Sequence, residues 1–168
     1  MPKRLAILRH AKSDWDRPGL TDFDRPLNAR GRTAADVIRS AIAERHLSFD
    51  LIIASPSART SETLDRLGMA ESARWEEQLY LAGRERLFAI IRALPDEAQS
   101  VLMVGHNPGL HELVLELSRP DSIGLRKRVV AKFPTAALAL IQLKCESWSE
   151  IARGCGEIVE LLLPRELD

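Results

Sequence analysis

The chain of 168 residues lacks the features that mark several large classes of protein. Its only cysteines are Cys145 and Cys155, without a C-x-x-C pattern or a metal-like spacing. We therefore expect reduced thiols and neither a disulfide framework nor a zinc site. Lys and Arg together number 24, as do Asp and Glu. This zero net charge gives no reason to expect a nucleic-acid or membrane partner.

Long apolar segments are also missing. No apolar stretch approaches the roughly 18 residues of a membrane-spanning helix. The apolar run that follows Met1-Pro2-Lys3-Arg4 is too short for the core of a signal peptide and has no cleavage pattern after it, so we expect a cytoplasmic protein. Apolar residues make up 45% of the chain and charged residues 29%, as in ordinary globular proteins. At this length we expect one domain over residues 1–168 with a sizeable core.

Apolar segments of strand length alternate with helical patterns. Residues 3–9 are predicted to form a strand, because their unbroken apolar run, Leu5–Leu8, is typical of a strand buried on both faces. Further strands are predicted at residues 49–54, 100–104, 135–143 and 157–163. Helices are predicted at residues 28–46, from about residue 56, and at residues 84–94 and 110–117. This alternation predicts an α/β fold, a three-layer α/β/α sandwich with a mostly parallel central sheet.

Two helix starts and one long loop carry local signals. Asn28 is a favoured residue to cap the helix that follows it. Ser55 is a candidate cap with Pro56 in the first turn of the next helix. Residues 12–27 are polar and predict a loop that begins where the first strand ends. Long loops of this kind are usually functional or disordered.

Basic side chains stand at the carboxyl ends of three predicted strands. Arg9 and His10 end the first, Arg59 lies in the first helical turn after the second, and His106 follows the third. Because the carboxyl ends of parallel strands share one edge, these side chains can converge. An arginine at a helix N-terminus is unfavourable unless an anion lies beside it. Arginine binds phosphate bidentately and a neutral imidazole can attack phosphorus, so the pattern predicts a phosphate site.

The same segments resemble the histidine phosphatase superfamily and, within it, the small SixA-type branch of phosphohistidine phosphatases. The resemblance follows chain order and rests on the segments Leu8-Arg9-His10-Ala11-Lys12-Ser13, Arg25-Pro26-Leu27-Asn28, Ser55-Pro56-x-x-Arg59 with Thr63, Gly105-His106-Asn107-Pro108-Gly109 and Pro134-Thr135-x-Ala137. Most of the superfamily has glycine where this chain has Ala11, and alanine is familiar in the SixA-like branch. The resemblance implies a phosphoglycerate mutase-like fold that uses no metal and no cofactor.

What the resemblance implies for function is a metal-independent phosphohistidine phosphatase with a covalent phosphohistidine intermediate on His10. The other implied site residues are Arg9 and Arg59 as a phosphate clamp, His106 as a contact to the phosphoryl group, and Arg25 and Asn107 as substrate-binding residues. The expected partner is a phosphohistidine-bearing protein, either a phosphotransfer domain or a phosphocarrier. Inorganic phosphate is the expected product, and neither nucleic acid nor membrane is expected to take part.

A general acid has no clear place in the sequence. Larger superfamily members use an acidic residue to protonate an alcohol leaving group, and the candidates here are Glu76, Glu77, Asp14 and Asp16. If residues 75–79 form a strand, Glu76 and Glu77 point in opposite directions. Imidazole, whose conjugate acid has a pKa of about 6.5, can leave already protonated. The missing acid therefore favours phosphohistidine over sugar phosphates.

Three other readings remain open at this stage. The first is a phosphatase of the same fold that acts on small phosphomonoesters, with one of those carboxylates as the acid. The second is a non-catalytic module that binds phosphate or phosphohistidine. The third, a metal site formed by His106, His111 and Glu112, is disfavoured because histidines five residues apart on a helix point in different directions.

Overall fold

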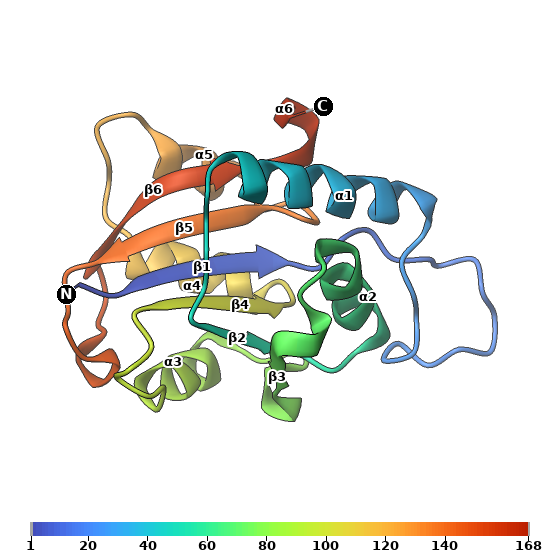
Figure 1. Cartoon of the computed structure of the whole chain (residues 1–168), viewed down its shortest axis with the longest axis horizontal. Coiled ribbons are helices and arrows are strands. Elements are labelled where there is room, and N and C mark those ends of the chain that lie inside the picture. Colours follow the sequence, from blue (N-terminus) through green and yellow to red (C-terminus); the bar gives the residue numbers. More distant parts are fainter. Residues whose placement is uncertain (1, 168) are drawn as a thin grey trace.

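A six-stranded sheet forms the centre of the protein (Figure 1), whose computed structural model describes residues 2–167. The strand order is β3-β2-β4-β1-β5-β6. The strands are β1 (Arg4–Arg9), β2 (Leu51–Ala54), β3 (Ala73–Trp75), β4 (Ser100–Gly105), β5 (Leu138–Leu143) and β6 (Gly156–Leu162). β1, β2, β3 and β4 run parallel, whereas β5 and β6 pair antiparallel. The sheet is thus mostly parallel, as predicted.

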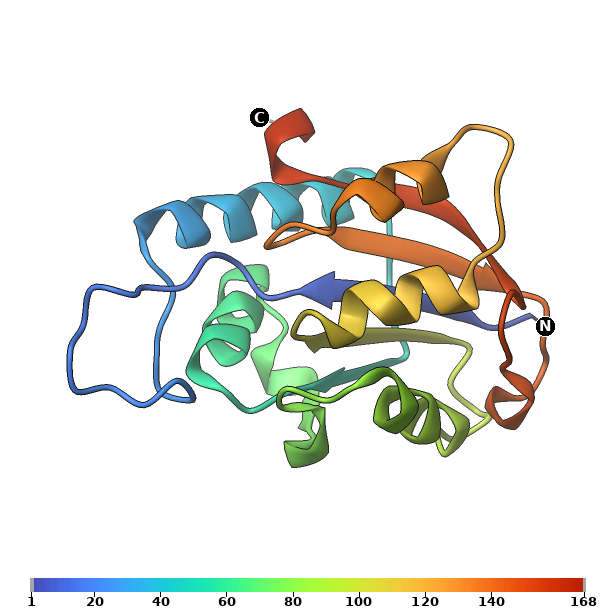
Figure 2. The same cartoon turned by 180° about the vertical axis from the view of Figure 1, so that it is seen from behind.

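Helices cover both faces of the sheet, which confirms the three-layer α/β/α arrangement. One face carries α1 (Ala29–Glu44) and α2 (Ala58–Leu67), in front of the strands in Figure 1. The opposite face, in front in Figure 2, carries α3 (Arg84–Arg92), α4 (Gly109–Leu117) and α5 (Leu125–Ala131). A short helix, α6 (Pro164–Leu167), follows β6 and contacts α1. Within residues 2–167, no helix is both long and apolar enough to cross a membrane.

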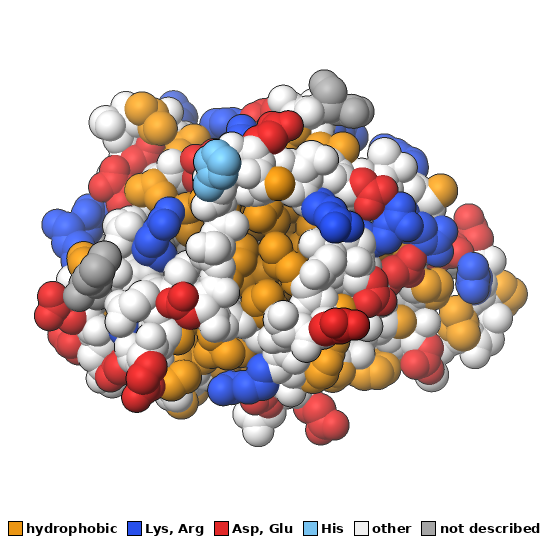
Figure 3. Space-filling view, viewed as in Figure 1, with side chains coloured by type: hydrophobic (Ala, Val, Ile, Leu, Met, Phe, Trp, Pro, Cys, Tyr) orange, Lys and Arg blue, Asp and Glu red, His pale blue; other side chains and the backbone are white. Residues whose placement is uncertain are grey.

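β1 lies between the two hydrophobic cores, as its unbroken apolar run predicts. Leu5 and Ile7 belong to the core under α3 and α4, and Ala6 and Leu8 belong to the core under α1 and α2. All four side chains have no exposed surface. Figure 3 shows that some apolar side chains also reach the surface in the middle of the α1 face. Cys145 and Cys155 are both free thiols.

Several predicted elements differ from the structure. β3 and α5 were not predicted from the sequence. The strand predicted at residues 135–143 begins three residues later, at Leu138. Leu138 is the first strand residue because the preceding Ala136 has a left-handed backbone, with φ of 61°. The prediction that Ser55 caps α2, with Pro56 in the first turn, was also wrong. The cap position is held by Ser57, α2 begins at Ala58, and Pro56 lies outside the helix.

The long loop after β1 returns to the sheet at a closely packed point. Ser13 pairs with Leu27 in an isolated antiparallel bridge. Asn28 caps α1 by accepting a hydrogen bond from the Gly31 amide at 2.8 Å, as predicted. A Cβ atom on Gly31 would lie 2.1 Å from the Lys12 carbonyl oxygen. Only glycine allows α1 to lie so close to the loop, and this contact places the loop over the ends of the strands.

Candidate active site

A cleft of about 350 Å³ lies at the carboxyl ends of β1, β2 and β4. Its lining includes every residue predicted for the site, together with other residues of the loop. The lining residues are Arg9, His10, Lys12, Ser13, Trp15, Asp22, Arg25, Arg59, Leu81, His106, Asn107 and Thr135. The parallel part of the sheet therefore brings together side chains that are far apart in the sequence.

The His10 imidazole is held in one tautomer. Its Nδ1 lies 2.7 Å from the Ala11 carbonyl oxygen, which can only accept, so Nδ1 carries the hydrogen. Its Nε2 accepts a hydrogen bond from Nε of Arg59 at 3.3 Å. Burial is the largest of the causes that lower the pKa of His10 to about 3. The Ala11 hydrogen bond raises the pKa, and the neighbouring His106, Arg59 and Arg9 lower it. His10 is therefore neutral at physiological pH, with an Nε2 lone pair facing Arg59.

Arg59 extends from the first turn of α2, where its charge opposes the helix dipole. The side chain is buried, with 3% of its surface exposed. Its Nη2 donates to Oδ2 of Asp22 at 3.1 Å. The sequence predicted an anion beside Arg59, and in the structure that anion is the Asp22 carboxylate.

Asp22 is the site residue that the sequence reading missed. Its Oδ1 accepts from Nη2 of Arg25 at 3.0 Å, and its Oδ2 accepts from Arg59 and from the Tyr80 hydroxyl. Burial alone raises the pKa of this carboxyl, but the hydrogen bonds from Tyr80 and Arg25 and the charge of Arg59 hold it well below its usual range. Asp22 therefore stays ionised and bridges both arginines.

Two residues of the cleft lining have a buried side-chain nitrogen without a hydrogen-bond partner. Over residues 2–167, the buried side-chain nitrogens without a partner are Nε of Arg4, Nε of Arg9 and Nδ1 of His106, and the last two residues line the cleft. Buried polar atoms are nearly always paired, so such atoms at one cleft indicate a ligand. A tetrahedral oxyanion supplies acceptors for both.

His106 is oriented by Ser55, the residue expected to cap α2. The Ser55 hydroxyl lies 2.8 Å from Nε2 of His106 and also accepts from the Ser57 amide at 3.4 Å. With its oxygen already accepting, the hydroxyl can donate to Nε2, which favours a hydrogen on Nδ1. Burial, followed by the charge of Arg59, lowers the pKa of His106 to about 3. His106 is thus neutral, and with Ser55 donating to Nε2 its unpaired Nδ1 carries the hydrogen.

Arg9 extends from the end of β1, and its Nη1 donates to the Phe133 carbonyl oxygen at 3.3 Å. Burial and then the charge of Arg59 lower its pKa from the usual value for arginine. Two guanidinium groups close enough to repel each other make an arrangement that an anion would relieve. The cleft is therefore suited to a doubly charged oxyanion such as phosphate.

Arg25 and Asn107 are more heavily engaged within the protein. Arg25 stacks on Trp15, with its guanidinium carbon 3.4 Å from the ring centroid, and donates to the Ser13 hydroxyl at 2.5 Å. The Asn107 amide nitrogen donates to the Phe133 carbonyl oxygen at 2.8 Å, and its oxygen accepts from the His111 amide at 3.2 Å. Both residues line the cleft while holding the segments around it in place.

None of the acidic residues considered as general acids lines the cleft. Glu76 caps a short 3₁₀ turn by accepting from the Gln78 amide, and Glu77 begins that turn. The expectation that these two alternate along a strand was wrong, because β3 ends at Trp75. Asp14 accepts from Arg17 and from the amide of Asp16.

The histidines considered for a metal site have other partners. Nε2 of His111 lies 2.6 Å from the Val129 carbonyl oxygen, so His111 has a partner within the protein. His106 is bound to Ser55. Across residues 2–167, no three side chains of His, Cys, Asp or Glu gather as metal ligands would.

Comparison with known proteins identifies relatives along nearly the whole chain. A sequence model of the histidine phosphatase superfamily (branch 1) matches residues 5–82. A protein from Agrobacterium tumefaciens, assigned as phosphohistidine phosphatase SixA, is 31% identical, with a TM-score of 0.81 over 98% of this chain and 100% of that one. One from Nakamurella, assigned likewise, is 27% identical, with a TM-score of 0.85 over 98% of this chain and 97% of that one. An uncharacterised chloroplast protein of Arabidopsis thaliana is 30% identical over 88% of this chain and 70% of its own.

Proposed function

Because the chain belongs to the histidine phosphatase superfamily, we propose that it hydrolyses protein phosphohistidine through a phosphohistidine intermediate on His10. The observation that carries the proposal is the state of His10. Its Nδ1–H is held by the Ala11 carbonyl, and its Nε2 lone pair faces the cleft beside Arg59. A neutral, buried and oriented imidazole is the form required of a nucleophile at phosphorus.

In the first step, Nε2 of His10 attacks phosphorus, the P–Nε2 bond forms, and the P–N bond of the substrate breaks. The Nδ1–H of His10 stays bonded to the Ala11 carbonyl oxygen, which stabilises the positive charge that develops on the ring. The substrate imidazole leaves as a neutral group when its other ring nitrogen already carries a hydrogen. No protein acid is needed for this departure.

In the second step, water attacks phosphorus, the P–Nε2 bond breaks, and inorganic phosphate leaves. His10 departs as a neutral imidazole, because its hydrogen remains on Nδ1 throughout. Arg9, Arg59 and Nδ1 of His106 bind the phosphoryl oxygens as negative charge shifts among them; their shared position in the cleft lining and the unpaired nitrogens of Arg9 and His106 support this role. The roles of Arg25 and Asn107 as substrate contacts are part of the same proposal.

Phosphohistidine suits this cleft better than an alkyl phosphate. An alkoxide needs a proton as it leaves, and the carboxyl group in the cleft, that of Asp22, has its pKa held below the usual range. An ionised carboxylate cannot serve as a general acid. A phosphorylated imidazole supplies its own proton, so a site with this carboxylate can still turn it over.

A rapid-quench experiment tests the proposal. Wild-type protein is mixed in single turnover with a phosphohistidine protein, and acid-labile phosphoenzyme is trapped beside the matched variants His10→Ala and His111→Gln. We expect transient phosphoenzyme in the wild type and in His111→Gln, and neither phosphoenzyme nor turnover in His10→Ala. Turnover that survives His10→Ala would overturn the assignment. Phosphate binding without any wild-type turnover would indicate a binding module instead.

A further inference from the structure

A groove leads from the cleft across the surface between α1 and α6, which lie side by side in Figures 1 and 2. Lys12 and Thr135 line both the cleft and this groove, so the two are continuous. The groove then follows the first turns of α1. We call it the basic groove, defined by the cations Lys12, Arg30, Lys132 and Arg165 and by the apolar residues Ala34, Val37, Leu163 and Pro164.

The positive charge of the basic groove is not compensated. Within residues 2–167, its cations make no side-chain hydrogen bond and no ion pair. The acidic residue in its lining, Glu166, is bound to Arg128 instead. The whole chain has a net charge of zero, so this concentration of unpaired cations is a local feature. Such clusters attract anionic partners and raise the rate of association.

The apolar residues indicate which kind of anionic partner fits. Ala34 and Val37 lie three residues apart on one side of α1, next to its buried positions Ala35 and Ile38, and Leu163 and Pro164 lie where β6 leads into α6. All four are partly exposed. A small anion would use only the cations, whereas a protein surface that mixes carboxylates with apolar side chains would contact both.

We propose that the basic groove docks an acidic surface of the phosphohistidine-bearing protein while its phosphohistidine enters the cleft. This inference rests on the proposed function and adds a determinant of substrate choice outside the reacting groups. The continuity through Lys12 places the docked surface next to the phosphoryl group. Attraction between the two surfaces accelerates encounter with the phosphoprotein and leaves the chemical step unchanged.

The experiment compares two substrates and two matched double variants. Arg30→Glu/Lys132→Glu reverses the charge of the basic groove at residues outside the cleft lining. Lys144→Glu/Arg153→Glu makes the same change in net charge near the start of β6, at the opposite end of the sheet. The probes are free phosphohistidine and a histidine phosphotransfer domain with acidic residues around its phosphohistidine.

We expect the groove variant to lower kcat/KM for the phosphotransfer domain about tenfold or more at low ionic strength, and to leave kcat/KM for free phosphohistidine within about twofold. Lysine substitutions at the acidic residues of the domain should restore its turnover by the groove variant. Equal loss with both substrates, or equal loss in both double variants, would overturn the docking inference alone. Absence of wild-type turnover on free phosphohistidine and on the domain would overturn the proposed function, and the inference with it.

Discussion

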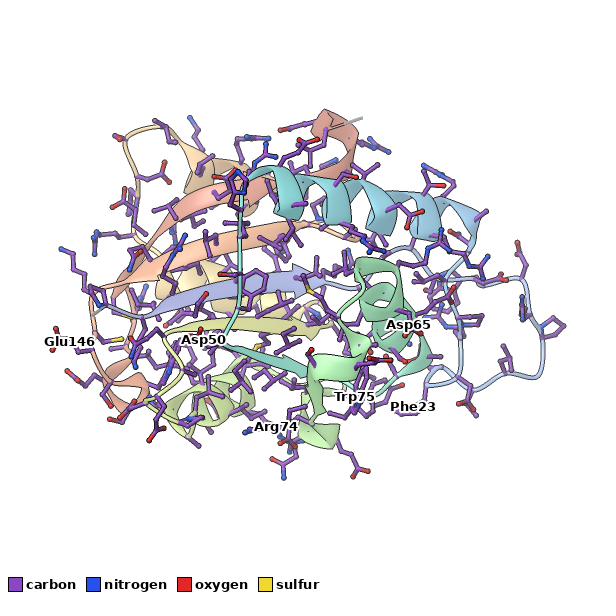
Figure 4. The ribbon with its side chains drawn as sticks, in the orientation of Figure 1. Phe23, Asp50, Asp65, Arg74, Trp75 and Glu146 are labelled. Atoms are coloured by element: carbon purple, nitrogen blue, oxygen red, sulfur yellow. The ribbon has the colours of Figure 1, made fainter. Side chains whose placement is uncertain are left out.

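Asp22 binds Arg59 through both its main chain and its side chain. The Asp22 carbonyl oxygen accepts from Nη1 at 2.8 Å, and its carboxylate accepts from Nη2 at 3.1 Å. The loop segment around it is held against α2, because the Ala58 amide donates to the Phe23 carbonyl oxygen at 2.9 Å. Figure 4 labels Phe23 at the part of the loop that lies beside α2. A carboxylate thus occupies guanidinium donors that a phosphate would otherwise use.

The first prediction concerns this competition. Asp22→Asn keeps the shape and the backbone contact but removes the negative charge beside Arg25 and Arg59. We expect tungstate to bind about tenfold more tightly to the variant, because the competing charge is gone. Isothermal titration calorimetry measures the affinity. Weaker binding would instead show that the Asp22 charge is needed to hold the arginines in place.

The second prediction concerns pH. Burial holds the pKa of both His10 and His106 at about 3, against about 6.5 in the unfolded chain. Below about pH 6.5 the unfolded chain therefore binds more protons, and the free energy of unfolding falls as the pH drops toward 3. Each imidazole contributes at most about 1.4 kcal/mol per pH unit. Denaturant unfolding at several pH values should show a smaller slope for His106→Asn than for the wild type, and parallel curves would contradict the prediction.

The third prediction concerns the partner of His106. Ser55→Ala removes the hydroxyl bound to Nε2, and leaving that buried atom unpaired costs about 1–3 kcal/mol of stability. Without this hydroxyl, the hydrogen of His106 is no longer held on Nδ1, so kcat should fall. Ser57→Ala is the matched control, because its hydroxyl bonds Thr60 at 2.7 Å and does not touch His106. Equal kcat values for the two variants would show that Ser55 has no positioning role.

The fourth prediction concerns the start of α4. A Cβ on Gly109 would lie 2.0 Å from the Ala82 carbonyl oxygen, so backbone must move to admit it. Gly109→Ala should therefore lose about 1–3 kcal/mol of unfolding free energy and displace the segment that carries His106. Gly83→Ala, where no heavy atom lies within 4 Å, should lose less than about 1 kcal/mol. Urea unfolding of both variants measures the difference, and equal losses would refute the packing explanation.

Elements with a clear local sequence pattern could be predicted, and elements too short to show a pattern could not. The unbroken apolar run of β1 and the cap at Asn28 are local patterns, and both are present in the structure. β3 has only three residues and is too short to show a period. The antiparallel direction of β5 is invisible in its composition, because a buried strand is apolar in either direction.

The site residues likewise divide into those that could be predicted from the sequence and those that could not. Arg9, His10, Arg59 and His106 each follow or begin a regular element, so the fold class alone brings them to one cleft. Asp22 lies in a loop with other aspartates, Asp14, Asp16 and Asp24 among them, and no local pattern separates it from these. Asp22 reaches Arg59 only because the folded loop packs against α2, which the sequence does not reveal. Ser55 was misread for a related reason, since a serine before a helix resembles a cap whichever partner it finally binds.

The central place of β1 has a consequence for the protein during its synthesis. β1 leaves the ribosome well before its two hydrogen-bonding neighbours, β4 and β5, which are made much later. Until then both edges of β1 are unpaired, and the His10 amide lacks the Gly105 carbonyl oxygen that it binds in the finished fold. A nascent chain thus carries an exposed, aggregation-prone strand that chaperones would have to shield. The cleft around His10 likewise forms only after β4 has been made, because His106 follows that strand.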